Sequence, residues 1–386
     1  MSETLPRFSA DEYRRRYALL ETWLDESGLD ALLLYANSYG NGGIRWLSGF
    51  AARHDTYLLW PRRGKPVLLT HLFNHVPNAR RVSVLDDVRW AGPRSAETVL
   101  ALLRERDLER GKIGVAGRVP YADYRALTAG LPEATWQPAG KGFTTLRLIK
   151  SAEEVAWLRR GAAHTDAALV ALVAAATPGA SEYELAAAIE GAYTAAGGEH
   201  GIHFLSSTPM DAPHAYVPAQ TQTARRLRKG DAIICELSAG VGGYAGQIHR
   251  LLTVGRPPTP AYRRLYDVAR SAYEQIVAVL RPEATVGTVL DAATEIAAAG
   301  LTVCDDLLHG YGMGYLPPVV RTRQTAHSEQ APEDFRFEEN MAVVVQPNVY
   351  DPESGAGLQV GNLLLVTPAG AEALQKYPLD VVVCGA

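Results

Sequence analysis

The sequence predicts two domains, an α/β domain followed by an α+β domain that is built from two similar halves. Up to about residue 145, apolar runs of strand length alternate with helical patterns, which is typical of a compact α/β domain. Beyond that point, two helices joined by a proline-containing turn occur twice, with the turns at Pro178 and Pro282. Strand-rich sequence follows each pair. We therefore expect domains over residues 1–145 and 146–386, with a site where the two halves of the second domain meet.

The first domain opens with a helix. Ser9 and Glu12 have the spacing of an N-terminal capping box, apolar and aromatic residues then recur at helical spacing, and Gly28 ends the pattern. The run "DALLLYA" predicts a buried strand, and "DTYLLWP" with "PVLLT" predicts a hairpin around the turn "RRGK". The segments "VLDDVRW", "AETVLALLRERDLE" and "KIGVAG" continue the alternation of strand and helix.

The second domain opens with two capped helices. Ser151 with Glu154, and Ser181 with Glu184, form capping boxes on either side of the turn at Pro178. A similar layout recurs over residues 261–301, which supports the internal duplication.

Composition excludes several classes of protein. The 386 residues are 47% hydrophobic and 21% charged, with a net charge of −4, as in ordinary globular proteins. Basic runs are too short to indicate nucleic-acid binding, and apolar runs are too short to span a membrane. The start of the chain lacks the apolar segment of a secretion signal. Three scattered cysteines (Cys235, Cys304, Cys384) suggest neither a disulfide framework nor a zinc cluster, so we expect a cytoplasmic protein.

Polar residues interrupt an apolar stretch at Cys235–Arg250, "CELSAGVGGYAGQIHR". It predicts two strands joined by a glycine-rich turn. The strand period places Gln247 and His249 on one face, with Glu236 opposite them on the partner strand. A carboxylate, an amide and an imidazole can together bind an organic molecule and move protons near neutral pH. A dinucleotide-binding loop is excluded because the following "QIHRLLTV" predicts a strand and not a helix.

Six motifs in order resemble the site motifs of the pita-bread fold family, which includes methionine aminopeptidase, Xaa-Pro aminopeptidase, prolidase and creatinase. They are "HAY", "RRLRKGDAIICELSAG", "GYAGQIHR", "LHGYGMGY", "NMAVVVQPNVY" and "GLQVGNLLLVT". In the first domain, "LDALLLYANSYGNGGIRWLSGF" resembles the creatinase-type N-terminal domain. The resemblance covers nearly the whole chain. It implies an α+β pita-bread catalytic domain over residues 146–386, preceded by an α/β creatinase-type N-terminal domain over residues 1–145.

The resemblance also implies where a metal centre would lie. The metallopeptidase branch holds two divalent cations with two Asp, one His and two Glu. The matching positions here are Glu236, Gln247, His309, Gln346 and Gly361, of which His309 alone is unchanged. One carboxylate cannot offset the charge of two dications, and Leu316 stands where the family has a second histidine. We therefore expect no bound metal and no cofactor.

Creatinase, a metal-free relative, gives the main functional hypothesis. The resemblance matches His214 to its catalytic histidine, although the segment from His214 to Glu236 is five residues longer than usual, and His249 falls where creatinase has a catalytic Glu. The hypothesis is a metal-independent enzyme that hydrolyses or rearranges a C–N bond in a small, polar, nitrogen-containing, non-peptide molecule. Its catalytic residues would be His214, Glu236, His249 and His309. Its substrate-binding residues would be Gln247, Gln346, Tyr311, Arg53, His54, Arg321 and Arg323.

The same resemblance implies a homodimer in which Arg53 and His54 of the N-terminal domain complete the partner's site. Arg321 and Arg323 could equally be solvent-exposed surface residues.

Three alternatives to the main hypothesis stay open. The chain could be a non-catalytic binding module, since pita-bread domains without metals also serve as binding proteins. It could be a mononuclear metalloenzyme that uses Glu236, His249 and His309, provided that three donor atoms converge within ~2.3 Å of one point. Or it could be a hydrolase like the Xaa-Pro peptidases.

Overall fold

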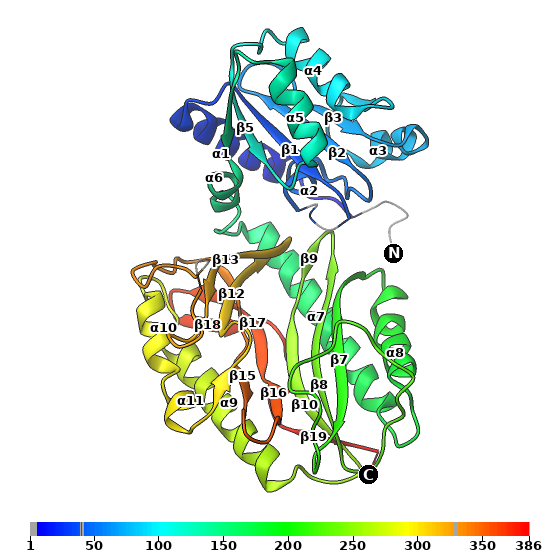
Figure 1. Ribbon diagram of the computed structural model, residues 1–386, viewed down its shortest axis with the longest axis vertical. Coiled ribbons are helices and arrows are strands. Elements are labelled where there is room, and N and C mark those ends of the chain that lie inside the picture. The colour runs from blue at the N-terminus through cyan, green and yellow to red at the C-terminus, as the bar shows by residue number, and fades with distance from the viewer. Residues whose placement is uncertain (1–5, 39, 41, 328–329, 386) are drawn as a thin grey trace. The chain divides into compact units, whose positions relative to one another are not determined.

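The structure is a computed structural model that describes residues 6–38, 40, 42–327 and 330–385 (Figure 1). The chain divides into two compact units, Met1–Arg147 and Leu148–Ala386. The first unit is an α/β domain and the second an α+β domain, which confirms the fold class expected from the sequence.

The N-terminal unit is a six-stranded mixed sheet in the order β4-β3-β2-β1-β5-β6. The antiparallel pairs are β1 with β2 and β2 with β3, and the other neighbours are parallel. The strands are β1 (Ala31–Ala36), β2 (Thr56–Pro61), β3 (Val67–Thr70), β4 (Val88–Trp90), β5 (Lys112–Ala116) and β6 (Thr135–Pro138). The helices are α1 (Ala10–Ser27), α2 (Gly42–Ser48), the 3₁₀ helix η1 (Phe73–His75), α3 (Val76–Val82), α4 (Ser95–Glu105), α5 (Tyr121–Gly130) and α6 (Gly140–Thr145).

Helix α1 begins and ends where the sequence predicts. The Ser9 side chain accepts a hydrogen bond from the backbone N–H of Glu12, and Gly28 adopts the left-handed conformation (φ 61°) that closes the helix. Every residue of β1 and β2 is buried, which fits central strands covered on both faces.

The C-terminal unit contains a ten-stranded sheet and a separate three-stranded sheet. The large sheet runs β13-β12-β14-β17-β10-β8-β7, with β18 on β17, β19 on β10 and β9 on β8, and the small one runs β11-β15-β16. The strands are β7 (Glu199–Pro209), β8 (Asp231–Val241), β9 (Tyr244–Ala245), β10 (Ile248–Val254), β11 (Thr302–Val303), β12 (Leu308–Gly312), β13 (Gly314–Val320), β14 (Ala342–Val345), β15 (Asn348–Tyr350), β16 (Gly357–Gln359), β17 (Gly361–Thr367), β18 (Gly370–Ala373) and β19 (Val382–Cys384). The helices are α7 (Ala152–Ala175), α8 (Glu182–Thr194), α9 (Pro260–Val279), α10 (Val286–Ala292) and α11 (Glu295–Ala298).

The duplication is visible in this order of strands. Helices α7 and α8 precede β7, β8 and β10, and helices α9 to α11 precede β12, β14 and β17 (Figure 1). Both capping boxes that the sequence predicts, at Ser151 and Ser181, are present. The two halves meet where β10 pairs with β17 in the middle of the sheet.

Side chains alternate along the central strands between a helix-covered face and an open one. On β8, Ile233, Cys235 and Leu237 belong to the same hydrophobic core as Leu169 and Leu172 of α7. Glu236 lies between two of these core residues in the chain, so it points to the opposite face of the sheet. The helices thus build the core on one face and leave the other for polar groups.

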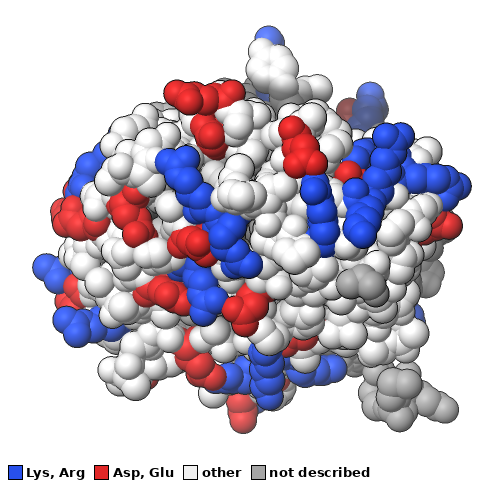
Figure 2. Space-filling model, turned by 90° about the horizontal axis from the view of Figure 1, so that it is seen from below, with Lys and Arg blue, Asp and Glu red and all other residues white. Residues whose placement is uncertain are grey.

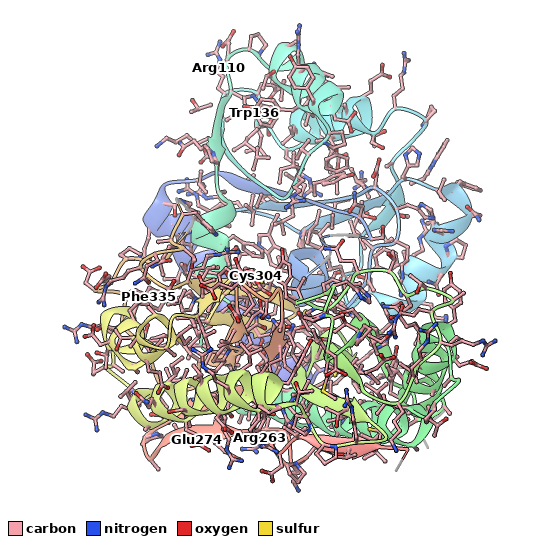
Figure 3. All side chains as sticks on the ribbon, turned by 60° about the horizontal axis from the view of Figure 1, so that its bottom comes forward. Arg110, Trp136, Arg263, Glu274, Cys304 and Phe335 are labelled. Atoms are coloured by element: carbon pink, nitrogen blue, oxygen red, sulfur yellow. The ribbon has the colours of Figure 1, made fainter. Side chains whose placement is uncertain are left out.

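Helix α9 packs on the other half of the sheet. Its outer side carries Arg263 and Glu274 (Figure 3), while Leu265, Ala269 and Ile276 are buried in the second core. On the face shown in Figure 2, acidic and basic side chains are interspersed. Within the described residues, the chain contains no helix that is long and apolar enough to cross a membrane.

The guanidinium of Arg250 is fully buried at the junction of the two halves. It donates five hydrogen bonds, to the carbonyls of His249 (2.8 Å), Gly361 (2.8 Å), Tyr377 (2.7 Å) and Pro378 (2.7 Å) and to the side-chain oxygen of Asn362 (2.9 Å). All five N–H groups of the side chain are therefore paired. Burial lowers its pKa to about 10, so the group stays cationic at neutral pH.

We predict that Arg250→Leu lowers the free energy of unfolding by ~3–5 kcal/mol, because five buried acceptors lose their donor at once. Chemical denaturation of the full chain measures this. The matched control, Arg263→Leu on the exposed side of α9, should stay within ~0.5 kcal/mol of the wild type. A loss no larger than that of the control would show that Arg250 does not hold the halves together.

Candidate active site

Three residues on neighbouring strands form a row across the junction of the halves. His249 on β10 lies opposite Glu236 on β8 and also opposite Gly361 on β17. Directly opposed residues share a face of the sheet, so Glu236 and His249 point to the same side. The Nε2 atom of His249 is 3.8 Å from Oε2 of Glu236. The amide of Gln247, two residues before His249, donates from Nε2 to Oε1 of Glu236.

Gly361 leaves the space that His249 needs. A Cβ atom at this position would lie 2.2 Å from the carbonyl oxygen of Val345 and 3.0 Å from Nδ1 of His249. The backbone oxygen cannot move aside without breaking the sheet, so any side chain here is strained. The imidazole of His249 therefore lies beside the position at which the resemblance implies a metal-binding glutamate.

Several buried polar atoms in this region have no hydrogen-bond partner in the described part of the chain. They are Oε1 of Gln247, both ring nitrogens of His249 and Oε1 of Gln346. An unsatisfied buried polar group costs about 1–3 kcal/mol, so four of them together indicate a place that groups from outside the chain are meant to fill.

Glu236 is ionised at neutral pH. Burial alone raises the pKa of Glu236, but the imidazoles of His249 and His309 and the amide of Gln247 together hold it below its ordinary value. The buried side chain thus provides a negative charge beside two histidines.

His309 on β12 presents one ring nitrogen as an acceptor. Its Nδ1 donates to the carbonyl of Gly310 (3.0 Å), which leaves the lone pair on Nε2. Burial lowers the pKa of His309, so the ring is neutral near pH 7. The ring packs against Tyr315 (4.4 Å between centroids) and the edge of Tyr311 (5.6 Å). The hydroxyl of Tyr311 donates to Ser238 on β8 (3.2 Å), which links β12 to the strand of Glu236.

Asp305 is a site residue that the sequence did not indicate. Burial raises the pKa of Asp305, and the nearby negative charge of Glu236 raises it further. Its carboxylate accepts a hydrogen bond from Gln359 (3.3 Å). The neighbouring Asp306 is buried against Tyr315 and Arg321. Two adjacent aspartates in a sequence ordinarily indicate a solvated turn, so the pattern alone does not point to a buried site.

The other expected residues have the following surroundings. His214 is exposed on the loop after β7, where its backbone N–H donates to Thr208 (2.8 Å). Arg53 and His54 are exposed in the N-terminal unit. The guanidinium of Arg321 pairs with Asp306 at 2.9 Å.

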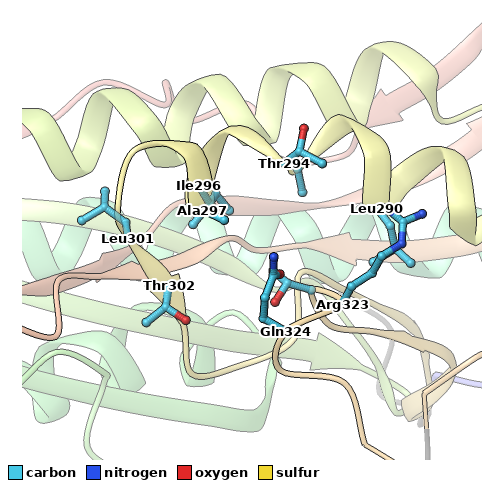
Figure 4. A pocket seen from close by; sticks show the side chains of 10 residues that line it. Leu290, Thr294, Ile296, Ala297, Leu301, Thr302, Arg323 and Gln324 are labelled. Carbon is cyan, nitrogen blue, oxygen red and sulfur yellow. The ribbon is translucent and has the colours of Figure 1, made fainter.

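Arg323 forms ion pairs with Glu333 and Asp291. It lines a cleft of about 90 Å³ between α10, α11 and the segment after β13 (Figure 4), which shares no lining residue with the Glu236 row.

The donor atoms do not fit a metal centre of the kind that the resemblance implies. The amide of Gln247 turns its nitrogen to Glu236, and Gly361 offers no ligand. Glu236, His249 and His309 also do not converge as the mononuclear alternative requires. Among the described residues, the one set of three potential ligands with donor atoms within 4.8 Å of one another is Glu190, His200 and His203.

Comparison with known families places the chain. Residues 156–368 match the model of Metallopeptidase family M24, and residues 16–149 match the Creatinase/Prolidase N-terminal domain. The M24 match covers more than half of the chain, so the protein belongs to this family of hydrolases, as the sequence motifs suggested.

Individual relatives have low sequence identity to this chain, and some align over nearly its whole length. The chain is 24% identical over 377 residues to the uncharacterized peptidase YqhT of Bacillus subtilis, covering 94% of this chain and 98% of the relative. It is 26% identical over 239 residues to the Xaa-Pro dipeptidase of Pyrococcus furiosus, covering 61% and 66%. The crystal structure of X-Pro aminopeptidase from Thermotoga maritima superposes with a TM-score of 0.81 at 18% identity, covering 94% of this chain and 98% of that one.

These relatives overturn the main functional hypothesis. A metal-independent enzyme for a C–N bond of a small non-peptide molecule is wrong as the leading function, because the similar proteins are named peptidases and dipeptidases. The hypothesis rests on the missing carboxylates as the sign of a different substrate. They alter the charge and donor set of the site, which does not by itself determine what it binds.

We predict that Gly361→Ala destabilises the protein by ~1–3 kcal/mol and displaces the ring of His249, because the new methyl group meets a backbone oxygen. Denaturation and the NMR signals of the histidine ring measure the two effects. Gly191→Ala, in α8 with no atom near its added Cβ, should instead be neutral or stabilising by up to ~1 kcal/mol. Unchanged stability and an unmoved His249 in Gly361→Ala would contradict the packing described.

The lowered pKa of Glu236 predicts a dependence of stability on pH. The ionised carboxylate of Glu236 stabilises the folded state at pH values above its ordinary pKa of 4.5. This contribution is lost as the pH falls through the lower pKa that Glu236 has in the folded state. The free energy of unfolding of the wild type should therefore fall relative to that of Glu236→Gln as the pH drops below 4.5. A difference that stays constant on acidification would show that the carboxylate is not held as described.

Proposed function

We propose that the protein is a peptidase that binds a short peptide over the row of Glu236, His249 and Gly361, with an Xaa-Pro bond as its target. The observation that carries the proposal is the group of unpartnered buried polar atoms around the ionised Glu236. An Xaa-Pro dipeptide offers the N–H donors of its terminal ammonium group and the carbonyl acceptor of its peptide bond, which complement an amide oxygen and an imidazole. The Xaa-Pro dipeptidase among the relatives supports the choice of bond.

The two oxygens of Glu236 have different roles in this proposal. Gln247 holds Oε1, and Oε2 faces His249. Oε2 accepts a proton from the water that attacks the peptide carbonyl. The new C–O bond forms, the C–N bond breaks, and the proton passes to the leaving nitrogen. His249 stabilises the charge that develops beside Glu236, and the Nε2 atom of His309 accepts a hydrogen bond from the substrate.

A second candidate function is peptide binding without catalysis. It is favoured because Gln247, Gln346 and Gly361 stand at positions where the resemblance implies carboxylate ligands. A site that has lost three of five expected ligands could retain the peptide and lose the chemistry. The two functions share the binding site and differ in turnover.

We further propose a cytoplasmic homodimer in which Arg53 and His54 contribute to the partner's site. Both side chains are exposed in the N-terminal unit and can contact another chain. Sedimentation at micromolar concentration should give a species of twice the mass of 41.7 kDa. A stable single chain would contradict this part of the proposal.

We predict that the wild type releases proline from Xaa-Pro dipeptides, measured by mass spectrometry with no added metal and with Mn²⁺, Co²⁺ or Zn²⁺. Glu236→Gln should reduce the rate by ~10²–10⁴-fold, the typical effect of removing a general base. Glu274→Gln, on the outer side of α9, serves as the matched control and should leave the rate unchanged.

Hydrolysis unaffected by Glu236→Gln would refute the assigned role. If no condition gives hydrolysis but the peptide raises the melting temperature, the non-catalytic candidate replaces the peptidase. If the protein neither hydrolyses nor binds the peptide, both candidate functions are wrong.

A further inference from the structure

A second cluster of polar side chains lies on the helix-covered side of the sheet. Glu190 is on α8, and His200 and His203 are on β7, the edge strand. Donor atoms of the three side chains all lie within 4.8 Å of one another. Their spacing in the sequence does not predict this cluster, and the proposed peptidase function does not use it.

A β-bulge brings the two histidines to the same side. Residues three apart on a regular strand point to opposite faces. The pairing of β7 with β8 shifts between His200 and Ile202, so that His200 lies opposite Ala239 and His203 opposite Leu237. Those two partners are two residues apart, so they share one face of β8. Gly201 at the bulge has no room for a side chain, since a Cβ there would lie 2.7 Å from the carbonyl oxygen of Ser238.

The spacing of the donor atoms suits a small cation. One oxygen of Glu190 lies 3.6 Å from Nδ1 of His200 and 3.5 Å from Nδ1 of His203. Ligands bound at ~2.0–2.1 Å in tetrahedral geometry lie about 3.3–3.4 Å apart. The two distances from Glu190 are therefore within a few tenths of an ångström of this spacing, and the two histidine nitrogens lie within 4.8 Å of each other.

His203 is the most informative member. Its side chain is 4% exposed, and neither ring nitrogen has a hydrogen-bond partner in the described part of the chain. Burial, followed by the neighbouring His200, lowers the pKa of His203. Ring contacts with Tyr193 and His200, at 5.3 and 4.4 Å, explain why the imidazole is buried. They do not explain why a carboxylate and a second imidazole approach the same nitrogen.

We propose that Glu190, His200 and His203 bind one borderline divalent cation of the Zn²⁺, Ni²⁺ or Cu²⁺ class, with water at the remaining positions. Two imidazoles and one carboxylate are ligand types that Zn²⁺, Ni²⁺ and Cu²⁺ prefer, whereas Mg²⁺ and Ca²⁺ prefer oxygen ligands alone. The hydroxyl of Tyr193 lies 3.2 Å from Nδ1 of His200, and it gives up this hydrogen bond when the nitrogen binds the ion.

The bound ion would tie α8 to the edge of the sheet. Phe204, next to His203, lies opposite Glu236 in the pairing of β7 with β8. The cation is thus on the other face of the strand that flanks the candidate active site. Its binding stabilises the folded C-terminal unit and does not depend on the proposed peptidase function.

Calorimetric titration of the full-length protein with ZnCl₂ tests the proposal, with cobalt absorption as the second readout of tetrahedral ligation. We expect one equivalent whose affinity falls at least tenfold in His203→Ala and in Glu190→Gln. His164→Ala, which removes a half-buried imidazole from the neighbouring α7, is the matched control and should bind as the wild type does. Glu236→Gln should also retain this equivalent, which separates it from any ion at the candidate active site.

Circular dichroism checks that His203→Ala is folded. If it is not, the exposed Glu190→Gln variant decides the outcome alone. Absence of zinc binding would overturn the proposal, and so would binding that Glu190→Gln leaves unchanged or that Glu236→Gln abolishes.

Discussion

The buried guanidinium of Arg250 is the interaction on which the candidate site depends. It donates to the carbonyls of His249 and Gly361, one on each of the two strands that join the halves. Because these same residues form the row with Glu236, the cation fixes the register that sets His249 against the carboxylate. Its other bonds reach the C-terminal segment at Tyr377 and Pro378. One side chain thus ties the duplicated halves and the end of the chain to the site.

The row itself shows how the site departs from the metal-binding pattern implied by the resemblance. The absence of a side chain at Gly361 fits the imidazole of His249, since a Cβ at 361 would lie 3.0 Å from Nδ1 of the ring. Gln247 then neutralises no charge but holds the remaining carboxylate by a hydrogen bond. The result is a single ionised Glu236 beside buried polar atoms that lack hydrogen-bond partners in the described part of the chain, which suits the polar groups of a peptide better than two dications.

Local signals in the sequence were sufficient for the fold and for part of the site. The capping boxes at Ser151 and Ser181 and the turn at Gly28 are short-range features, and the structure confirms them. The strand period placed Glu236, Gln247 and His249 together. Asp305 and the pair of His200 and His203 could not be found this way. Asp305 comes near Glu236 through strand pairing between distant segments, and the two histidines share a face because of a bulge at Gly201 that no period reveals.

The central claim is that a peptide supplies the partners that Gln247, His249 and Gln346 lack. The most direct measurement is a crystal structure of the Glu236→Gln variant with an Xaa-Pro dipeptide, in which turnover is slowed. We expect the scissile bond over the row of β8, β10 and β17, with the terminal ammonium group donating to the amide oxygens of Gln247 and Gln346 and the scissile carbonyl accepting from the ring of His249. A dipeptide bound elsewhere, or a row whose polar atoms are paired with ordered water alone at saturating dipeptide, would contradict it.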